Sequence, residues 1–216
     1  MKIEKNYELW AFRLAAFIGG VFGSYAVIRY GMFSSAQTMN ILTLLLSLFG
    51  TNFGEFLFRL VVALFYAFGV AVGVLVPRYT KVDVRLVSII VTAVSTAILV
   101  IAPEGTSPEI ISIPIFFAMA LQWGAFPGAN GYASACVFLT NNFRQTIMGF
   151  TNYLCTKEKK YSDHCKFYLF TIISYALGCA MSYYLMRFFG YRAIVFAIVP
   201  LILIFFIIRK DKKEAK

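Results

Sequence analysis

The stretch "AQTMNILTLL" (residues 36–45) decides the fold, because it interrupts two long apolar runs with a hydroxyl and an amide. A second stretch, "FLTNNFRQTI" (residues 138–147), repeats its Thr-x-Asn spacing and adds Arg144. Irregular backbone at membrane depth is tolerated only where protein buries it or where it lines a water-filled cavity. We therefore expect two broken helices at these stretches rather than two plain membrane crossings.

The composition predicts an all-α, multi-pass integral membrane protein. Of the 216 residues, 60% are hydrophobic and only 14% are charged, and the mean hydropathy is +0.76. A soluble domain carries about 25% charged residues. The net charge of +10 comes from basic residues in the tails and loops. That distribution indicates attraction to anionic lipid headgroups at the cytoplasmic face of a cell membrane, with no nucleic-acid partner.

The N-terminal apolar run and the cysteines predict neither a cleaved leader nor a cofactor. Residues 9–30 form a run that is too long for a signal peptide and is typical of a first span. Cys155, Asp163, His164 and Cys165 flank one basic loop, but their spacing matches no common zinc pattern. We expect a reduced cytoplasmic loop there and no metal site.

The sequence contains eight apolar segments, each about as long as the 17–25 residues that a spanning helix needs. These segments are residues 9–30, 34–50, 57–76, 86–102, 110–126, 133–154, 167–186 and 193–208. If all eight span, 11 Lys/Arg lie inside and 6 outside. If the second and sixth segments enter and leave on one side, the loop "PRYTKVDVR" (residues 77–85) moves inside and the count becomes 14 against 3. The positive-inside rule favours six spans plus two re-entrant segments, with both termini cytoplasmic.

Two later spans indicate an internal repeat. "YAFGVAVGVLVPR" (Tyr66–Arg78) and "YALGCAMSYYLMR" (Tyr175–Arg187) share five residues at a constant offset of 109. In both halves the order is a span, a Thr-x-Asn segment, this span and one more span. An odd number of spans per unit predicts two inverted repeats, residues 1–102 and 103–216, with a solute site near the midplane between them.

The chain resembles the YoaK family of bacterial membrane proteins of unknown function from about Leu14 to Ile208. The blocks that carry the resemblance are "IGGVFGSYAVIRYGMFSSAQTMNILTLLLSLFG", "AMALQWGAFPGANGYASACVFLTNNFRQTIMGFTNYL" and "YALGCAMSYYLMRFFG". The family motifs correspond to Gly19, Gly20, Ala36, Gln37, Thr38, Asn40, Leu121, Gln122, Thr140 and Asn142, with Met39 and Asn141 in place of the family's middle glycines. The resemblance implies six spans in a bacterial plasma membrane and no established substrate.

The Thr-x-Asn segments suggest a function in solute passage. Thr and Asn are preferred N-cap residues, and a helix N-terminus carries roughly half a positive elementary charge. Two such ends meeting at the midplane would attract an anion or a polar neutral solute. The expected pathway residues are Thr38, Asn40, Gln122, Thr140, Asn142 and Arg144. For the four Thr and Asn residues, capping without solute contact is the alternative.

Arg144 and Gln122 leave alternatives open. An arginine inside an apolar segment costs at least ~2.5 kcal/mol on insertion scales, so it faces a partner, a cavity or the membrane surface. Arg144 therefore meets an anionic solute, or it snorkels or bonds to carbonyls. Gln122 lines the same cavity or cross-links helices. Arg59, two residues into its segment, is expected to snorkel.

The leading hypothesis is a channel or secondary transporter for a small polar or anionic solute, as a possible homo-oligomer. The alternative is a membrane scaffold whose polar residues only hold helices together. An enzyme is disfavoured, since the apolar segments contain no His, no carboxylate pair and neither an HExxH nor a GxSxG motif.

Overall fold

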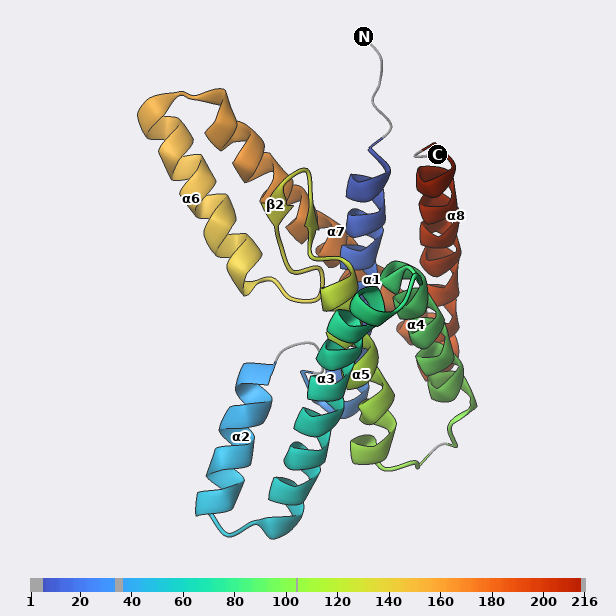
Figure 1. Cartoon of the computed structure of the whole chain (residues 1–216). Helices are drawn as coiled ribbons and strands as arrows, with labels where there is room; N and C mark the ends of the chain where they lie inside the picture. Colours follow the sequence, from blue (N-terminus) through green and yellow to red (C-terminus); the bar gives the residue numbers. More distant parts are fainter. Residues whose placement is uncertain (1–5, 34–36, 104, 215–216) are drawn as a thin grey trace.

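The computed structural model describes residues 6–33, 37–103 and 105–214, and it is an all-α, polytopic membrane protein. The helices are α1 (Tyr7–Tyr30), α2 (Gln37–Phe49), α3 (Phe53–Tyr79), α4 (Val84–Ile101), α5 (Pro108–Ala125), α6 (Thr140–Thr156), α7 (Lys159–Phe189), the 3₁₀ helix η1 (Tyr191–Ala197) and α8 (Ile198–Glu214). Figure 1 shows their arrangement. Ala36, the first residue of the quoted stretch, lies outside the described residues.

Five helical segments of the described chain are long and apolar enough to cross a membrane: α1, α3, α4, α7 and the continuous run of η1 and α8. The sixth expected span is α5, a shorter apolar helix. By contrast, α2 has 13 residues and extends about 20 Å, which is well short of the roughly 30 Å hydrocarbon core.

Helix α1 forms the centre of the molecule. Its buried residues run from Ala11 to Ala26, and it packs against α5, α7 and α8. The outer helices expose large apolar side chains such as Phe68, Ile90 and Leu203, as helices in contact with lipid do. A chain with this distribution has a buried core and an apolar perimeter.

Close helix contact depends on glycines at the α1–α7 and α3–α5 crossings. A Cβ atom on Gly178 would lie 2.0 Å from the carbonyl oxygen of Phe17, and one on Gly69 would lie 2.7 Å from that of Phe117. Such distances are impossible for a real Cβ, so only glycine permits these approaches. Gly73 differs, because a Cβ there would find its nearest neighbours at 3.7 Å.

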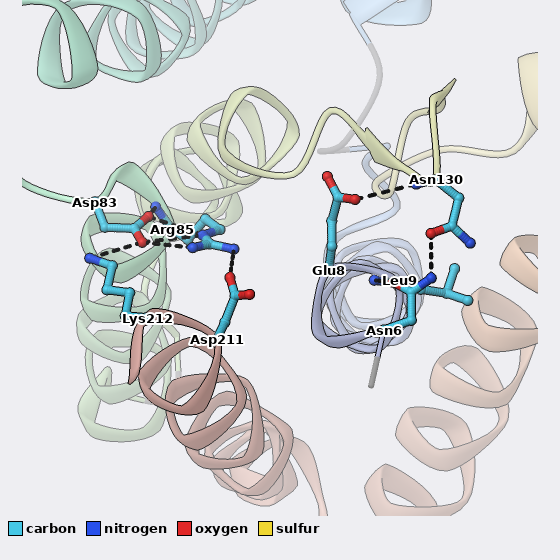
Figure 2. A network of polar contacts seen from close by, with 8 residues as sticks. All are labelled: Asn6, Glu8, Leu9, Asp83, Arg85, Asn130, Asp211 and Lys212. Atoms are coloured by element: carbon cyan, nitrogen blue, oxygen red, sulfur yellow. Dashed lines mark hydrogen bonds and ion pairs between the residues drawn. The ribbon is translucent and has the colours of Figure 1, made fainter. Parts of the chain in front are cut away.

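The start of α1 and the end of α8 lie on one face of the molecule, which we call the tail face (Figure 1). The hydroxyl of Tyr7 donates to Glu214 at 2.8 Å. Arg85 bonds to Asp211 at 3.2 Å, and Lys212 lies 3.1 Å from Asp83. Figure 2 shows the contacts among Asp83, Arg85, Asp211 and Lys212. The loop between α3 and α4 therefore shares a face with the C-terminal tail, as the charge count requires.

A short β-hairpin between α5 and α6 also lies at the tail face, and the sequence did not indicate it. Strands β1 (Gly128–Ala129) and β2 (Tyr132–Ala133) pair antiparallel. The N–H of Asn130 donates to Glu8, and the Asn6 amide donates to the Asn130 side chain (Figure 2). The sixth apolar segment, expected to run from residue 133, becomes helical only at Thr140.

The boundary of α7 corrects a second expectation. The basic loop of residues 155–166 is mostly helical, because α7 already begins at Lys159. His164 contacts the Tyr132 and Tyr168 rings, and Phe167 stacks on Phe12. The second and third turns of α7 thereby pack against the hairpin and the N-terminal half of α1.

Replacing Asp83 with Asn tests the tail-face network. Burial alone would raise the pKa of Asp83, but hydrogen bonds from Arg85 and Lys212 lower it from 3.8 to about 2. Because the folded state holds the lower pKa, the stabilisation is complete above about pH 4 and is lost as the pH falls toward 2. We expect D83N to reduce the free energy of unfolding at pH 7 by about 1–2 kcal/mol.

Thermal unfolding of the detergent-solubilised protein between pH 7 and pH 2 measures this effect. The control is E158Q, which breaks the exposed ion pair between Glu158 and Lys160. That variant should unfold like the wild type, since exposed pairs contribute little. Identical pH profiles for D83N and wild type between pH 4 and pH 2 would contradict the assignment.

Replacing Gly178 with Ala tests the close contact of α1 and α7. The added methyl group forces the two backbones apart. We therefore expect G178A to lower the free energy of unfolding by about 1–3 kcal/mol, as overpacked sites do. The matched control is G73A, where the methyl has room and alanine has the better helix propensity. Thermal melts of both variants give the comparison, and equal stability would show that the crossing tolerates a side chain.

Candidate functional site

The first residues of α2 and α6 face one cavity from opposite directions. In Figure 1, α2 runs from the middle of the molecule away from the tail face, whereas α6 runs from the middle toward it. Gln37 and Thr38 of α2 and Thr140 of α6 line a cavity of about 670 Å³. The threonines of the two Thr-x-Asn stretches therefore line one cavity.

The cavity is built from both halves of the chain. Its lining residues are Gly23, Ser24, Val27, Phe33, Gln37, Thr38, Ile41, Tyr66, Trp123, Phe138, Leu139, Thr140, Tyr175 and Cys179. Tyr66 of α3 and Tyr175 of α7, the first residues of the aligned segments, contribute one ring each. The volume falls in the range of small-molecule sites, and the wall is largely apolar with a few polar groups.

Asn40 lies beneath this wall rather than in it. The side chain is 2% exposed, and its Nδ2 donates to the carbonyl oxygen of Phe33 at 3.2 Å. Its Oδ1 accepts from Arg59 at 2.8 Å, and Arg59 also bonds to Glu55 at 2.7 Å. The amide thus joins the segment that precedes α2 to the first turn of α2 and to α3.

Asn142 occupies the equivalent place in α6. It is fully buried, and its Nδ2 donates at 2.7 Å to the carbonyl oxygen of Ala135. Ala135 lies seven residues before Asn142, just as Phe33 lies seven residues before Asn40. A second Nδ2 contact reaches Phe138 at 3.2 Å, and Ser134 donates to Oδ1 at 2.7 Å. Both asparagines hold the irregular backbone that leads into a half-helix.

The expected capping role is wrong for α6. Its N-cap is Leu139, whose side chain cannot accept a hydrogen bond, and no side-chain cap is present. Thr140 is already helical, and Asn142 bonds to upstream carbonyls instead. The first intrahelical bond is donated by Phe143 to Leu139. The N–H groups of residues 140–142 therefore take no part in the helical hydrogen bonds, and they lie at the end of α6 that faces the cavity.

Gln37 is the polar side chain that the sequence argument left out of the site. Both its amide atoms are buried and have no hydrogen-bond partner among the described residues. Gln37 lines the cavity beside Thr38. A buried amide without a partner is costly, so its position is informative. The family motif had already marked this residue, and its place one residue before Thr38 was the available signal.

Gln122 joins helices and is not among the cavity-lining residues. It is 1% exposed, and its Nε2 donates to the carbonyl oxygen of Ala15 at 3.0 Å. Cys136 packs against it, with its Sγ 3.7 Å from the Gln122 carbonyl oxygen. Of the two alternatives for this glutamine, the geometry supports the cross-link between α5 and α1.

Arg59 and Arg144, two of the three arginines within the apolar segments, behave differently. Arg59 was expected to snorkel, but its side chain is only 14% exposed and its guanidinium is bound to Glu55 and Asn40. Arg144 lies on the exposed surface of α6, and no described residue pairs with it. It follows Thr140 by four residues, so it stands on the same helix face one turn further from the cavity.

The basic segment around α7 shows no metal cluster. Within the described ranges, no group of three His, Cys, Asp or Glu side chains could hold a metal ion. Cys155 is exposed, and His164 packs among aromatic rings. The sequence-based expectation of a plain loop was wrong about the secondary structure, because α7 already begins at Lys159.

Comparison with known proteins assigns the chain to a family. No curated protein and no solved structure matches the chain. Residues 11–207 match the family described as "Protein of unknown function (DUF1275)", which agrees with the resemblance to the uncharacterised YoaK family. Because the match covers nearly the whole chain, including both half-helices, the protein belongs to the DUF1275 family.

Proposed function

We propose that this protein is a channel or secondary transporter for a small polar or anionic solute, which passes through the cavity between α2 and α6. The observation that carries the proposal is the cavity of about 670 Å³ onto which both half-helices open, with the unpartnered amide of Gln37 in its wall. A solute that bonds to this amide would satisfy a group that the protein leaves unsatisfied.

Electrostatics favours a solute that accepts hydrogen bonds. Each half-helix N-terminus carries roughly half a positive charge, and the two ends face the same space. Thr38 and Thr140 add one hydroxyl from each end. Arg144 stands one turn away on the tail-face side of the cavity, where Leu42 is its counterpart in α2. This one-sided charge favours anions over cations.

The packing of the helices supports an origin by inverted duplication of residues 1–102 and 103–216. Helix α1 packs on α7 while α5 packs on α3, and α2 packs on α3 while α6 packs on α7. Likewise α4 packs on α5 while α8 packs on α1. Exchanging the two halves reproduces each pair, which is the pattern of transporters with a site at the repeat interface.

A scaffold without transport activity is the alternative, and it explains part of the site. It accounts for Asn40, Asn142 and Gln122, whose amides bond to backbone carbonyls. It does not account for Gln37, which bonds to no described residue and lines a cavity. We propose no enzymatic activity and no cofactor. The partners we propose are the bilayer, anionic headgroups at the tail face and further copies of the chain.

Flux through reconstituted liposomes tests the proposal. A panel of small monovalent anions and small polar neutral solutes should include at least one that the wild-type protein passes. We expect Q37L to lower that flux roughly tenfold, because one hydrogen bond to the solute is lost. We expect R144L to lower anion flux and to leave any neutral flux unchanged.

The control for Q37L is M39L, which changes an exposed side chain of α2 that does not line the cavity. It should retain wild-type flux. N40L is a second comparison and should reduce both flux and thermal stability, since Asn40 holds α2 in place. If no solute in the panel passes, or if Q37L and M39L are indistinguishable, the cavity is not the pathway.

Cysteine labelling from each side of the membrane tests the orientation. We expect single cysteines at Thr80 and Thr156 to react from the cytoplasmic side, like one in the C-terminal tail. A single cysteine at Thr51, between α2 and α3, should react from the exterior. The native cysteines are first replaced. Exterior labelling at Thr80 would contradict the inside position of the loop between α3 and α4.

A further inference from the structure

A second cavity, of about 200 Å³, lies at the face opposite the tail face. It is enclosed by the C-terminal ends of α1, α4 and α7, the start of α5 and the start of η1. Its lining residues are Tyr25, Arg29, Tyr30, Leu99, Ala102, Pro103, Thr106, Ile111, Phe189, Gly190, Tyr191 and Arg192. It shares no lining residue with the larger cavity.

Two arginines converge on this small space. Only three Lys/Arg residues of the chain are expected on this side of the membrane, namely Arg29, Arg187 and Arg192. Two of the three line the same cavity. The guanidinium carbon of Arg29 stands 4.0 Å from the centroid of the Tyr191 ring. Stacking of this kind holds the guanidinium in place and leaves its N–H groups free at the edge.

The start of the last helix adds donors to the same wall. Helical structure runs from Tyr191 to Glu214, and its first internal bond is donated by Ala193 to Gly190. The N–H groups of Tyr191 and Arg192 precede that bond, and both residues line the cavity. An anion in the cavity therefore meets a helix N-terminus as well as two guanidinium groups.

The helix C-termini at the cavity carry too little negative charge to cancel the positive charge of Arg29 and Arg192. The C-terminal ends of α1, α4 and α7 also border the cavity, and each carries at most about half a negative elementary charge. Two full positive charges on arginine and one helix N-terminus at least offset them. None of the described lining residues is acidic. Glu104, which follows Pro103, lies outside the described residues, so the experiment below includes it.

We propose that this cavity binds a phosphate group, carried either by the headgroup of an anionic lipid or by a free small anion. Paired arginines with backbone N–H groups are the donors that recognise phosphate oxygens bidentately. The site also gives a role to Arg29 and Arg192, two of the three cations expected on the exterior, where the positive-inside bias disfavours them. It is independent of the proposed solute pathway.

Thermal stability of the purified full chain separates the two sources. One arm compares nanodiscs of phosphatidylglycerol with nanodiscs of phosphatidylcholine. The other arm titrates inorganic phosphate into protein in a neutral detergent, against chloride at equal ionic strength. We expect a higher melting temperature with the anionic phosphate source. In R192Q the response should need a roughly tenfold higher concentration of the phosphate source or disappear.

The controls decide between binding and general charge effects. R187Q removes the third exterior arginine, which does not line the cavity, and should respond like the wild type. R29K retains the positive charge but not the paired N–H donors of the guanidinium, and it should weaken the response without loss of fold. Equal responses of R192Q, R187Q and wild type would overturn the proposal. A response that appears only in E104Q would also overturn it, because Glu104 would then be the natural partner of the arginines.

Discussion

One hydrogen bond, made twice, anchors both half-helices of this protein: an asparagine amide donates to the carbonyl seven residues earlier. Asn40 bonds to Phe33 and Asn142 bonds to Ala135. A helix that starts at membrane depth must be preceded by irregular backbone, whose carbonyls have no partner in lipid. One amide satisfies such a carbonyl and anchors it to the first helical turn. The bond ties the backbone before each half-helix to its first turn, at the end that faces the cavity.

The side-chain oxygens of Asn40 and Asn142 accept hydrogen bonds from different donors, and this difference explains where the charged residues lie. The oxygen of Asn142 accepts from Ser134, a short neutral donor. The oxygen of Asn40 accepts from Arg59, which in turn requires Glu55. A buried charge is tolerable only when it is paired and hydrogen-bonded, so this ion pair belongs to the support of α2. Arg144 has no such support among the described residues and lies on the exposed surface of α6.

Much of this architecture could be predicted from the sequence. Loop charge indicated two re-entrant segments, and the loop between α3 and α4 indeed shares a face with the C-terminal tail. The Thr-x-Asn spacing located both half-helix starts. The choice of acceptor for each asparagine was not predictable, because it depends on how the preceding chain bends. The hairpin at residues 128–133 and the fate of Arg59 also depend on tertiary contacts that no local pattern encodes.

The same contacts explain why a cavity survives in an otherwise close-packed bundle. Glycines at Gly178 and Gly69 bring α7 against α1 and α3 against α5, so the long helices leave little space between them. Helix α2 packs chiefly on α3, and α6 chiefly on α7, within the described chain. Each half-helix thus rests on one neighbour, and their starting ends meet no opposing helix. The asparagine bonds fix the ends of α2 and α6, and the glycine crossings fix the helices behind them. The cavity is the space left between the starts of α2 and α6 once the asparagine bonds and the glycine crossings are both formed.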